Sequence, residues 1–171
     1  MDFTEKIRNI PDFPVKGVLF RDITTLFKDP VAYPALIDAI AESLSGRDVD
    51  LVIGPEARGF VIGSALAYAL NAGFILARKP GKLPCKTLSY EYGLEYGTDT
   101  LEIHEDAIQR GQRVVFADDL LATGGTALAT IKLVEQAGGI IVGARFAIEL
   151  SSEFDGRKPL AGYDVQSIMK F

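Results

Sequence analysis

Two aspartates and a glycine-rich turn stand together in one segment, VVFADDLLATGGT, from Val114 to Thr126. The carboxylates of Asp118 and Asp119 fit a ribose, because they accept hydrogen bonds from vicinal hydroxyls and hold hydrated Mg²⁺. Backbone N–H groups at a helix start bind phosphate without a basic side chain. Gly124 and Gly125 would let a phosphate approach the backbone closely, and Thr123 and Thr126 would add hydroxyl donors. After an apolar run, this order predicts a sugar-phosphate site, against the alternative of solvated acids ahead of an ordinary helix cap.

The elements that must position this segment alternate along the chain. Hydrophobic periodicity predicts helices over Tyr33 to Leu44, Gly59 to Leu70 and Thr126 to Ala137. Short β-branched and apolar runs predict strands over Asp50 to Ile53, Phe74 to Ala77, Arg113 to Ala117 and Ile140 to Leu150. Strands separated by helices indicate an α/β domain with a mostly parallel sheet, whose ligand lies beyond the carboxyl ends of the strands.

Three strand-to-helix or strand-to-turn segments are expected to meet at that edge, namely 54–58, 78–82 and 118–126. The first, within GPEARGF, places Arg58 and Gly59 at a helix start and resembles a second anion site. The next carries Arg78, Lys79 and Lys82, three positive charges within five residues. A solvated turn is the alternative for this basic cluster, but convergence with two phosphate-competent loops favours anion binding.

Two further segments lack a regular pattern. The residues between Pro84 and Glu105 contain two Glu-Tyr-Gly repeats and suggest a mobile hairpin or lid, with Gly93 and Gly97 as flexible points. Disorder without a function is the alternative. The segment from Phe13 to Pro30 is too irregular for a core element, and we expect it to cap the crevice.

Composition excludes several classes of protein. The 171 residues are 48% hydrophobic and 24% charged, as in one compact domain. A net charge of −5 argues against a broad nucleic-acid surface. The single cysteine, Cys85, excludes an internal disulfide, and the single histidine, His104, excludes a His-rich metal cluster or a Ser-His-Asp triad. No signal-peptide core or membrane span is expected, so a cytoplasmic protein is the simplest inference.

Five segments resemble, in sequence and order, the adenine phosphoribosyltransferases, a branch of the type I phosphoribosyltransferases: GVLFRDIT, EARGF, RKPGKLP, LEYGTDTLEIH and VVFADDLLATGGT. The Asp-Asp-Leu-Leu-Ala-Thr pattern is the adenine form, whereas hypoxanthine-guanine enzymes usually carry Glu-Asp. Ala117 and Cys85 are small departures. The resemblance implies a single Rossmann-like domain, with an N-terminal arm and hood over residues 1–30, a core over 31–171 that includes a catalytic lid over 83–104, and a homodimer.

The resemblance also implies the reaction: adenine and 5-phosphoribosyl 1-diphosphate would give AMP and pyrophosphate. The 5'-phosphate would be held by Ala122, Thr123, Gly124, Gly125 and Thr126. Mg²⁺ would be coordinated mostly by substrate and water, with Asp118 and Asp119 as the protein carboxylates and no protein cage. The pyrophosphate loop would comprise Glu56, Ala57, Arg58 and Gly59, with a cis non-proline peptide, and the departing charge would be neutralised by Arg78, Lys79 and Lys82.

Within the lid, the family pattern LEYG points to Glu95 for proton transfer at adenine N7, with Glu91 as the internal competitor and Tyr96 helping closure. The hood would recognise adenine through backbone groups of Leu19 and Arg21, with Phe20 against the purine face. Ordinary packing is the alternative for Phe20.

Two other functions remain open from the residues. One is a transferase of the same fold that acts on xanthine or hypoxanthine. The other is a regulator that keeps the fold but binds nucleic acid. The adenine form of the acid-pair segment argues against the first, and the negative charge argues against the second.

Overall fold

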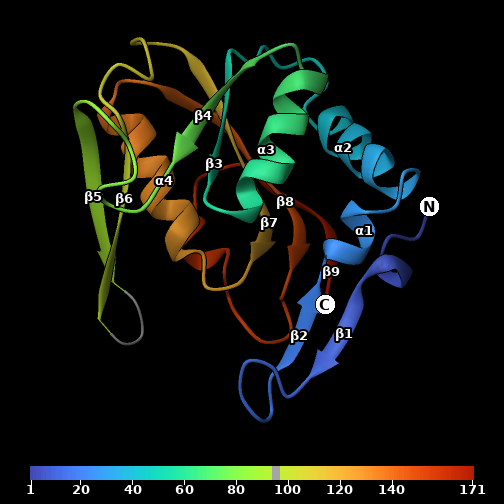
Figure 1. The fold of residues 1–171 in the computed structure, drawn as a ribbon. Helices are drawn as coiled ribbons and strands as arrows, with labels where there is room; N and C mark the ends of the chain where they lie inside the picture. The colour runs from blue at the N-terminus through green and yellow to red at the C-terminus, as the bar shows by residue number, and fades with distance from the viewer. Residues whose placement is uncertain (94–96) are drawn as a thin grey trace.

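The computed structural model describes residues 1–93 and 97–171, and its centre is a five-stranded parallel sheet (Figure 1). The strand order is β4-β3-β7-β8-β9. The bounds are β3 Leu51–Pro55, β4 Gly73–Ala77, β7 Arg113–Leu121, β8 Ile140–Glu149 and β9 Val165–Lys170. Every neighbouring pair in this sheet is parallel. The α/β class and the parallel sheet expected from the sequence are therefore confirmed.

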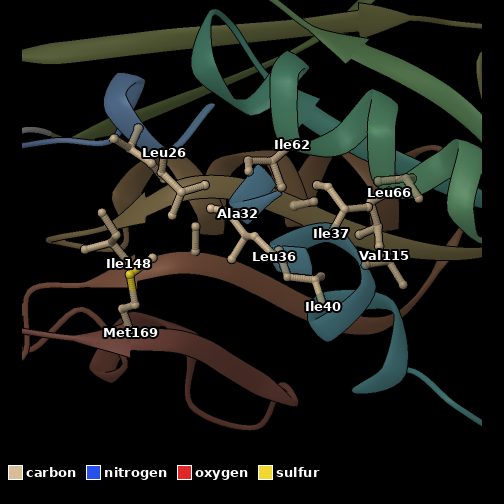
Figure 2. Close-up of a cluster of buried hydrophobic side chains, with 14 of the residues drawn as sticks. Leu26, Ala32, Leu36, Ile37, Ile40, Ile62, Leu66, Val115, Ile148 and Met169 are labelled. Carbon is tan, nitrogen blue, oxygen red and sulfur yellow. The ribbon is translucent and has the colours of Figure 1, made fainter. Parts of the chain in front are cut away.

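Helices cover both faces of the sheet, and consecutive residues of β7 show why. Val115 and Ala117 belong to one core with the helices α2 (Ala32–Glu42) and α3 (Arg58–Ala69), whereas Val114 and Phe116 belong to a second core with α4 (Gly125–Gln136). Side chains alternate between the two faces of a strand, so an uninterrupted apolar run is what a strand covered on both sides requires. Figure 2 shows the first core, in which α2 and α3 pack against Val115.

The N-terminal segment forms its own small layer. A 3₁₀ turn, η1 (Thr4–Lys6), precedes an antiparallel pair of strands, β1 (Arg8–Pro11) and β2 (Leu19–Asp22), and a short helix, α1 (Thr24–Phe27). The expectation that residues 13–30 are too irregular for a core element is wrong for the end of this segment, because Ile23 and Leu26 are buried in the first core (Figure 2 labels Leu26). A single turn of helix has too few residues to show a periodic pattern.

A second antiparallel pair, β5 (Thr87–Gly93) and β6 (Thr98–His104), forms the hairpin expected between Pro84 and Glu105. In Figure 1 it lies beside α4. Backbone hydrogen bonds between Arg78 and Glu102, of 2.9 and 2.7 Å, attach β6 to the end of β4. The hairpin is thus joined to the basic turn that follows β4.

The helices and strands expected from periodicity are present, with shifted ends. The largest shift is in β7, which continues four residues past the expected end at Ala117, so the acid pair lies in the strand and the loop to α4 is only three residues long. The strand β9 and the 3₁₀ turn η2 (Lys158–Leu160) were not expected. Among the described residues, no helix is long and apolar enough to cross a membrane.

Candidate active site

The loop from β7 to α4 carries the predicted phosphate-binding turn. Gly124 precedes the first residue of α4 and has a φ of +82°, which favours glycine. The turn therefore brings the chain abruptly from the strand into the helix. The first N–H groups of α4, which have no partner within the helix, stand at the carboxyl edge of the sheet.

The acid pair lies at the end of β7 with unequal exposure. Asp119 is 5% exposed, and its Oδ2 pairs with Nε of Arg58 from α3. Asp118 is partly buried, and its Oδ1 accepts a hydrogen bond of 2.9 Å from the backbone N–H of Asp119. Desolvation and the neighbouring charge of Asp119 raise the pKa of Asp118 well above its ordinary value. One carboxylate is therefore held by a cation, while the other is destabilised in its charged form.

Two glycines let the start of α3 approach the strands. A Cβ on Gly54 would lie 2.5 Å from the carbonyl oxygen of Gly59, and one on Gly59 would lie 2.9 Å from Oδ1 of Asp118. Any side chain at either position would push α3 away from β3 and the acid pair. The peptide between Glu56 and Ala57 is cis, as the resemblance implied for this loop.

The basic residues are each positioned differently. Nε of Arg78 donates a 2.6 Å hydrogen bond to Oε2 of Glu56, and Nζ of Lys79 pairs with Asp99 on β6. Lys82 is exposed. Thus Arg78 is fixed to the loop before α3, and Lys79 to the hairpin.

A cavity of about 330 Å³ opens between these elements. Its lining comes from the loop before α3, the end of β7 and the turn before α4: of the residues predicted for the site it includes Glu56, Ala57, Arg58, Asp118, Asp119, Ala122, Thr123, Gly124 and Thr126. Of the predicted basic residues, Arg58 lines this cavity, whereas Arg78, Lys79 and Lys82 are not among the lining residues in the described part of the chain. The structure brings the first and third loops together around this cavity, and Arg78 of the second loop reaches the cavity through its hydrogen bond to Glu56.

A second cavity of about 360 Å³ adjoins the N-terminal strands. Its lining includes Phe13, Phe20 and Arg21, and also Arg58, which the first cavity shares. The rings of Phe13 and Phe20 meet edge to face, with centroids 5.2 Å apart. The side chain of Arg21 donates a 2.6 Å hydrogen bond to Asn9 and lies over the ring of Phe171. Leu19 is 38% exposed. An aromatic-lined cavity thus lies next to the polar one.

Glu95 and Tyr96 lie outside the described residues, so their expected roles in the lid stay predictions. Glu91 is described and exposed on β5. Tyr92, its neighbour, is 9% exposed. Its hydroxyl lies 3.1 Å from Oδ2 of Asp99 and 3.4 Å from Oγ1 of Thr126, so this residue connects the hairpin to the phosphate-binding turn.

Sequence reasoning missed three features of this region: Tyr92, Asp99 and the approach of Gly54 to Gly59. Strand alternation within SYEYG could have assigned Tyr92 to the face opposite Glu91. No local signal could have revealed that Asp99 pairs with Lys79, because that contact depends on how the hairpin folds back on the turn after β4.

An acid pair, a glycine turn at a helix start and two adjoining cavities lie together at the carboxyl edge of a parallel sheet, and this arrangement is typical of one class of protein. Residues 24–152 match the family described as "Phosphoribosyl transferase domain". Over the full length of both chains, this chain is 56% identical to the adenine phosphoribosyltransferase of Alkaliphilus metalliredigens. The chain belongs to the adenine phosphoribosyltransferase family.

Two solved structures are similar over nearly the whole chain. The crystal structure of the adenine phosphoribosyltransferase of Thermoanaerobacter pseudethanolicus has a TM-score of 0.95 at 57% identity, covering 99% of this chain and 98% of that one. The enzyme of Saccharomyces cerevisiae, solved with D-2,5-dideoxy-2,5-imino-altritol 1,6-bisphosphate and adenine, has a TM-score of 0.90 at 36% identity, covering 97% and 96%.

Proposed function

We propose that this chain transfers the 5-phosphoribosyl group of 5-phosphoribosyl 1-diphosphate to N9 of adenine, giving AMP and pyrophosphate. The observation that carries this proposal is the pair of adjoining cavities, one polar and one aromatic, that share Arg58. A nucleotide likewise joins a polar sugar phosphate to an aromatic base. The yeast relative solved with adenine and a bisphosphate supports the assignment.

The sugar phosphate occupies the polar cavity. Ala122, Thr123, Gly124, Gly125 and Thr126 surround the 5'-phosphate, which accepts hydrogen bonds from their N–H groups at the positive end of α4. Asp118 and Asp119 accept hydrogen bonds from the ribose hydroxyls. Because Asp119 is already held by Arg58, its carboxylate is fixed before the sugar arrives.

Magnesium fits this site through its known preference for one or two carboxylates together with substrate and water oxygens. Asp118 and Asp119 present such oxygens in the polar cavity. When bound, the metal neutralises charge on the sugar diphosphate. The protein's own part is to hold the two carboxylates beside the ribose.

The leaving diphosphate binds the loop Glu56, Ala57, Arg58 and Gly59 together with Arg78, Lys79 and Lys82. In the structure, Arg78 is hydrogen-bonded to Glu56, and Lys79 forms an ion pair with Asp99. These acids keep the cations extended near the site, and the more highly charged diphosphate competes with them for the same N–H donors. Charge developing on the leaving group is stabilised in this way.

The base occupies the aromatic cavity. Phe20 contacts the purine face, and backbone groups of Leu19 and Arg21 pair with the amino group at C6 and with N1. Hypoxanthine reverses this donor and acceptor pattern, so it would leave buried polar groups unpaired. The edge-to-face contact with Phe13 supports Phe20 in this position.

Glu95 manages the proton at adenine N7, and Tyr96 helps close the lid over the site. Glu95→Gln should lower kcat strongly, whereas Glu91→Gln, the matched change four residues earlier in the sequence, should leave it near the parent value. Near-normal single-turnover rates for Glu95→Gln would assign the proton transfer elsewhere.

The chain forms a homodimer and works in the cytoplasm. Val61 and Tyr68, seven residues apart on one face of α3, are 37% and 90% exposed, and Leu76 on the edge strand β4 is 39% exposed. Exposed apolar side chains of this kind favour a protein interface. The exposed free thiol of Cys85 fits a reducing compartment.

The proposed reaction is tested by incubating the purified chain with Mg²⁺, 5-phosphoribosyl 1-diphosphate and adenine. AMP and pyrophosphate should form in equal amounts. Without adenine, release of pyrophosphate should be far slower. Absence of AMP under these conditions would contradict the proposal.

A further inference from the structure

The segment that follows β8 packs directly behind the phosphate-binding turn. A Cβ on Gly124 would overlap the carbonyl oxygen of Gly156 and lie 2.8 Å from the ring of Pro159. A Cβ on Gly156 would overlap the carbonyl oxygen of Ala122 and lie 3.0 Å from the side chain of Leu121. The backbone of this segment and the backbone of the turn therefore pack directly against each other at Gly124 and Gly156, where neither residue has a side chain.

The same segment is anchored by the residue next to Gly156. Arg157 donates two hydrogen bonds to the carboxylate of Glu149, of 2.6 and 2.8 Å, and a third of 3.0 Å to the carbonyl oxygen of Val165. Glu149 is 6% exposed at the end of β8, and Val165 begins β9. The guanidinium thus fixes the segment to two adjacent strands of the central sheet.

The charge balance favours a permanent contact. The pKa of Glu149 is lowered, mainly by its hydrogen bonds from Arg157, so the carboxylate is ionised at neutral pH. A buried carboxylate that accepts a two-pronged guanidinium is costly to separate from it, because the remaining charge would be left without a partner.

We infer that Arg157 is a positioning residue for the 5'-phosphate: by anchoring Gly156 against Ala122 and Gly124, it holds the phosphate-binding turn in the geometry that its N–H donors need. The inference rests on the proposed function, since it assumes that the turn binds that phosphate. Arg157 and Gly156 act through the backbone of the turn, from the side opposite the ligand.

Three substitutions test this role. Arg157→Ala removes the anchor, Arg157→Lys keeps the charge but not the two-pronged hydrogen bond, and Gly156→Ala places a methyl group against Ala122. Two matched controls lie in the same segment at exposed positions. Lys158→Ala removes one positive charge, and Ser152→Thr adds one methyl group.

The measurement is the Kd for ribose 5-phosphate, which carries the 5'-phosphate without the diphosphate, by titration calorimetry. The KM for adenine is measured beside it, at a temperature where circular dichroism shows every variant folded. Arg157→Ala and Gly156→Ala should raise the Kd about tenfold or more, the loss expected when one hydrogen bond to a charged group is broken. Arg157→Lys should have a smaller effect, and the controls should match the parent.

Equal ribose 5-phosphate affinity in folded Arg157→Ala and Gly156→Ala would overturn the inference, because a purely structural residue would lower only Tm. A parallel rise in the KM for adenine of the same size would also overturn it, since the effect would not be confined to the phosphate. If the parent chain neither bound ribose 5-phosphate nor formed AMP, the proposed function itself would fail, and the inference with it.

Discussion

At the scale of single residues, the pairing of Asp119 with Arg58 connects the two cavities. Asp119 is nearly fully buried at the end of β7, whereas the Arg58 side chain is 47% exposed at the start of α3. A buried carboxylate needs such a partner. Because Arg58 lines both cavities, one ion pair sets the position of the acid that we propose binds the ribose and of a cation beside the proposed base cavity.

Asp119→Asn should weaken binding of 5-phosphoribosyl 1-diphosphate. The amide keeps the size of the side chain but loses the negative charge that holds Arg58, and it keeps only one of the two oxygens that would accept hydrogen bonds from the ribose hydroxyls. We expect the KM for the sugar diphosphate to rise roughly 10- to 100-fold, as for the loss of a hydrogen bond to a charged group. Steady-state kinetics measure this, with the exposed Asp106→Asn as control. An unchanged KM would show that Asp119 does not contact the sugar.

Asp118 should make the folded protein less stable at neutral pH than it would be with a neutral residue there. Its pKa is raised in the folded state, so between the unfolded pKa, about 4, and the folded pKa the native chain binds more protons than the unfolded chain. The free energy of unfolding therefore falls as pH rises through that window, and the penalty is fully present above it.

Asp118→Asn removes this penalty and should raise Tm at neutral pH by a few degrees, since 1 kcal/mol moves Tm by roughly 2–4 °C for a chain of this size. The gain should shrink toward zero as pH is lowered below about 4, where the parent carboxyl is protonated in both states. Melting curves of both proteins across this pH range test it. A lower Tm for the variant at pH 7 would contradict the expected cost of the buried charge.

At the scale of elements, the β5–β6 hairpin is docked on the start of α4 through Tyr92. Its ring lies against Gly125, where a Cβ would be 3.5 Å from it, and its hydroxyl lies between Asp99 and Thr126. Burial is the main cause of the raised pKa of Tyr92, so the hydroxyl stays protonated and able to donate. The hairpin and the phosphate-binding turn are therefore held to each other.

Tyr92→Phe removes the hydroxyl contacts with Asp99 and Thr126 but keeps the ring, so it tests those contacts alone. The variant keeps the contact with Gly125, so stability should change by only about 1 kcal/mol, the net value of a typical hydrogen bond. The kcat/KM for 5-phosphoribosyl 1-diphosphate should fall roughly three- to tenfold, because the hairpin is less firmly placed. Tyr90→Phe, on the same face of β5, serves as control. Equal effects of the two changes would argue against a specific role for the Tyr92 hydroxyl.

The sequence predicted α3 and β8 well, because both are long stretches rich in apolar residues. The sequence also located the turn before α4, because two glycines and two threonines directly after an apolar strand are typical of a turn. It could not place Lys79, whose partner Asp99 is twenty residues away on a hairpin. Nor could it show that Gly156 supports the phosphate-binding turn, since that contact joins segments with no shared pattern.

At the scale of the whole molecule, the exposed apolar face of α3 predicts how two copies meet. Tyr68→Glu places a charge at the most exposed of these positions, and it should convert the proposed homodimer to a monomer without unfolding the chain, because Tyr68 is 90% exposed here. Sedimentation equilibrium measures the mass of parent and variant, with the exposed Glu105→Gln as control. A parent that sediments as a monomer would contradict the proposed dimer, and a variant that remains dimeric would move the interface elsewhere.

The whole molecule places an aromatic cavity at the N-terminal strands beside the polar cavity at the edge of the parallel sheet, which we propose binds the sugar phosphate. In the proposed function, base selectivity depends on how these two parts meet at Arg58. The most direct test is the ratio of kcat/KM for adenine to that for hypoxanthine, with saturating 5-phosphoribosyl 1-diphosphate and Mg²⁺. We predict a preference for adenine of about 10⁴ or more, because the wrong base leaves buried hydrogen-bonding groups unpaired. Comparable values for the two bases would contradict the account.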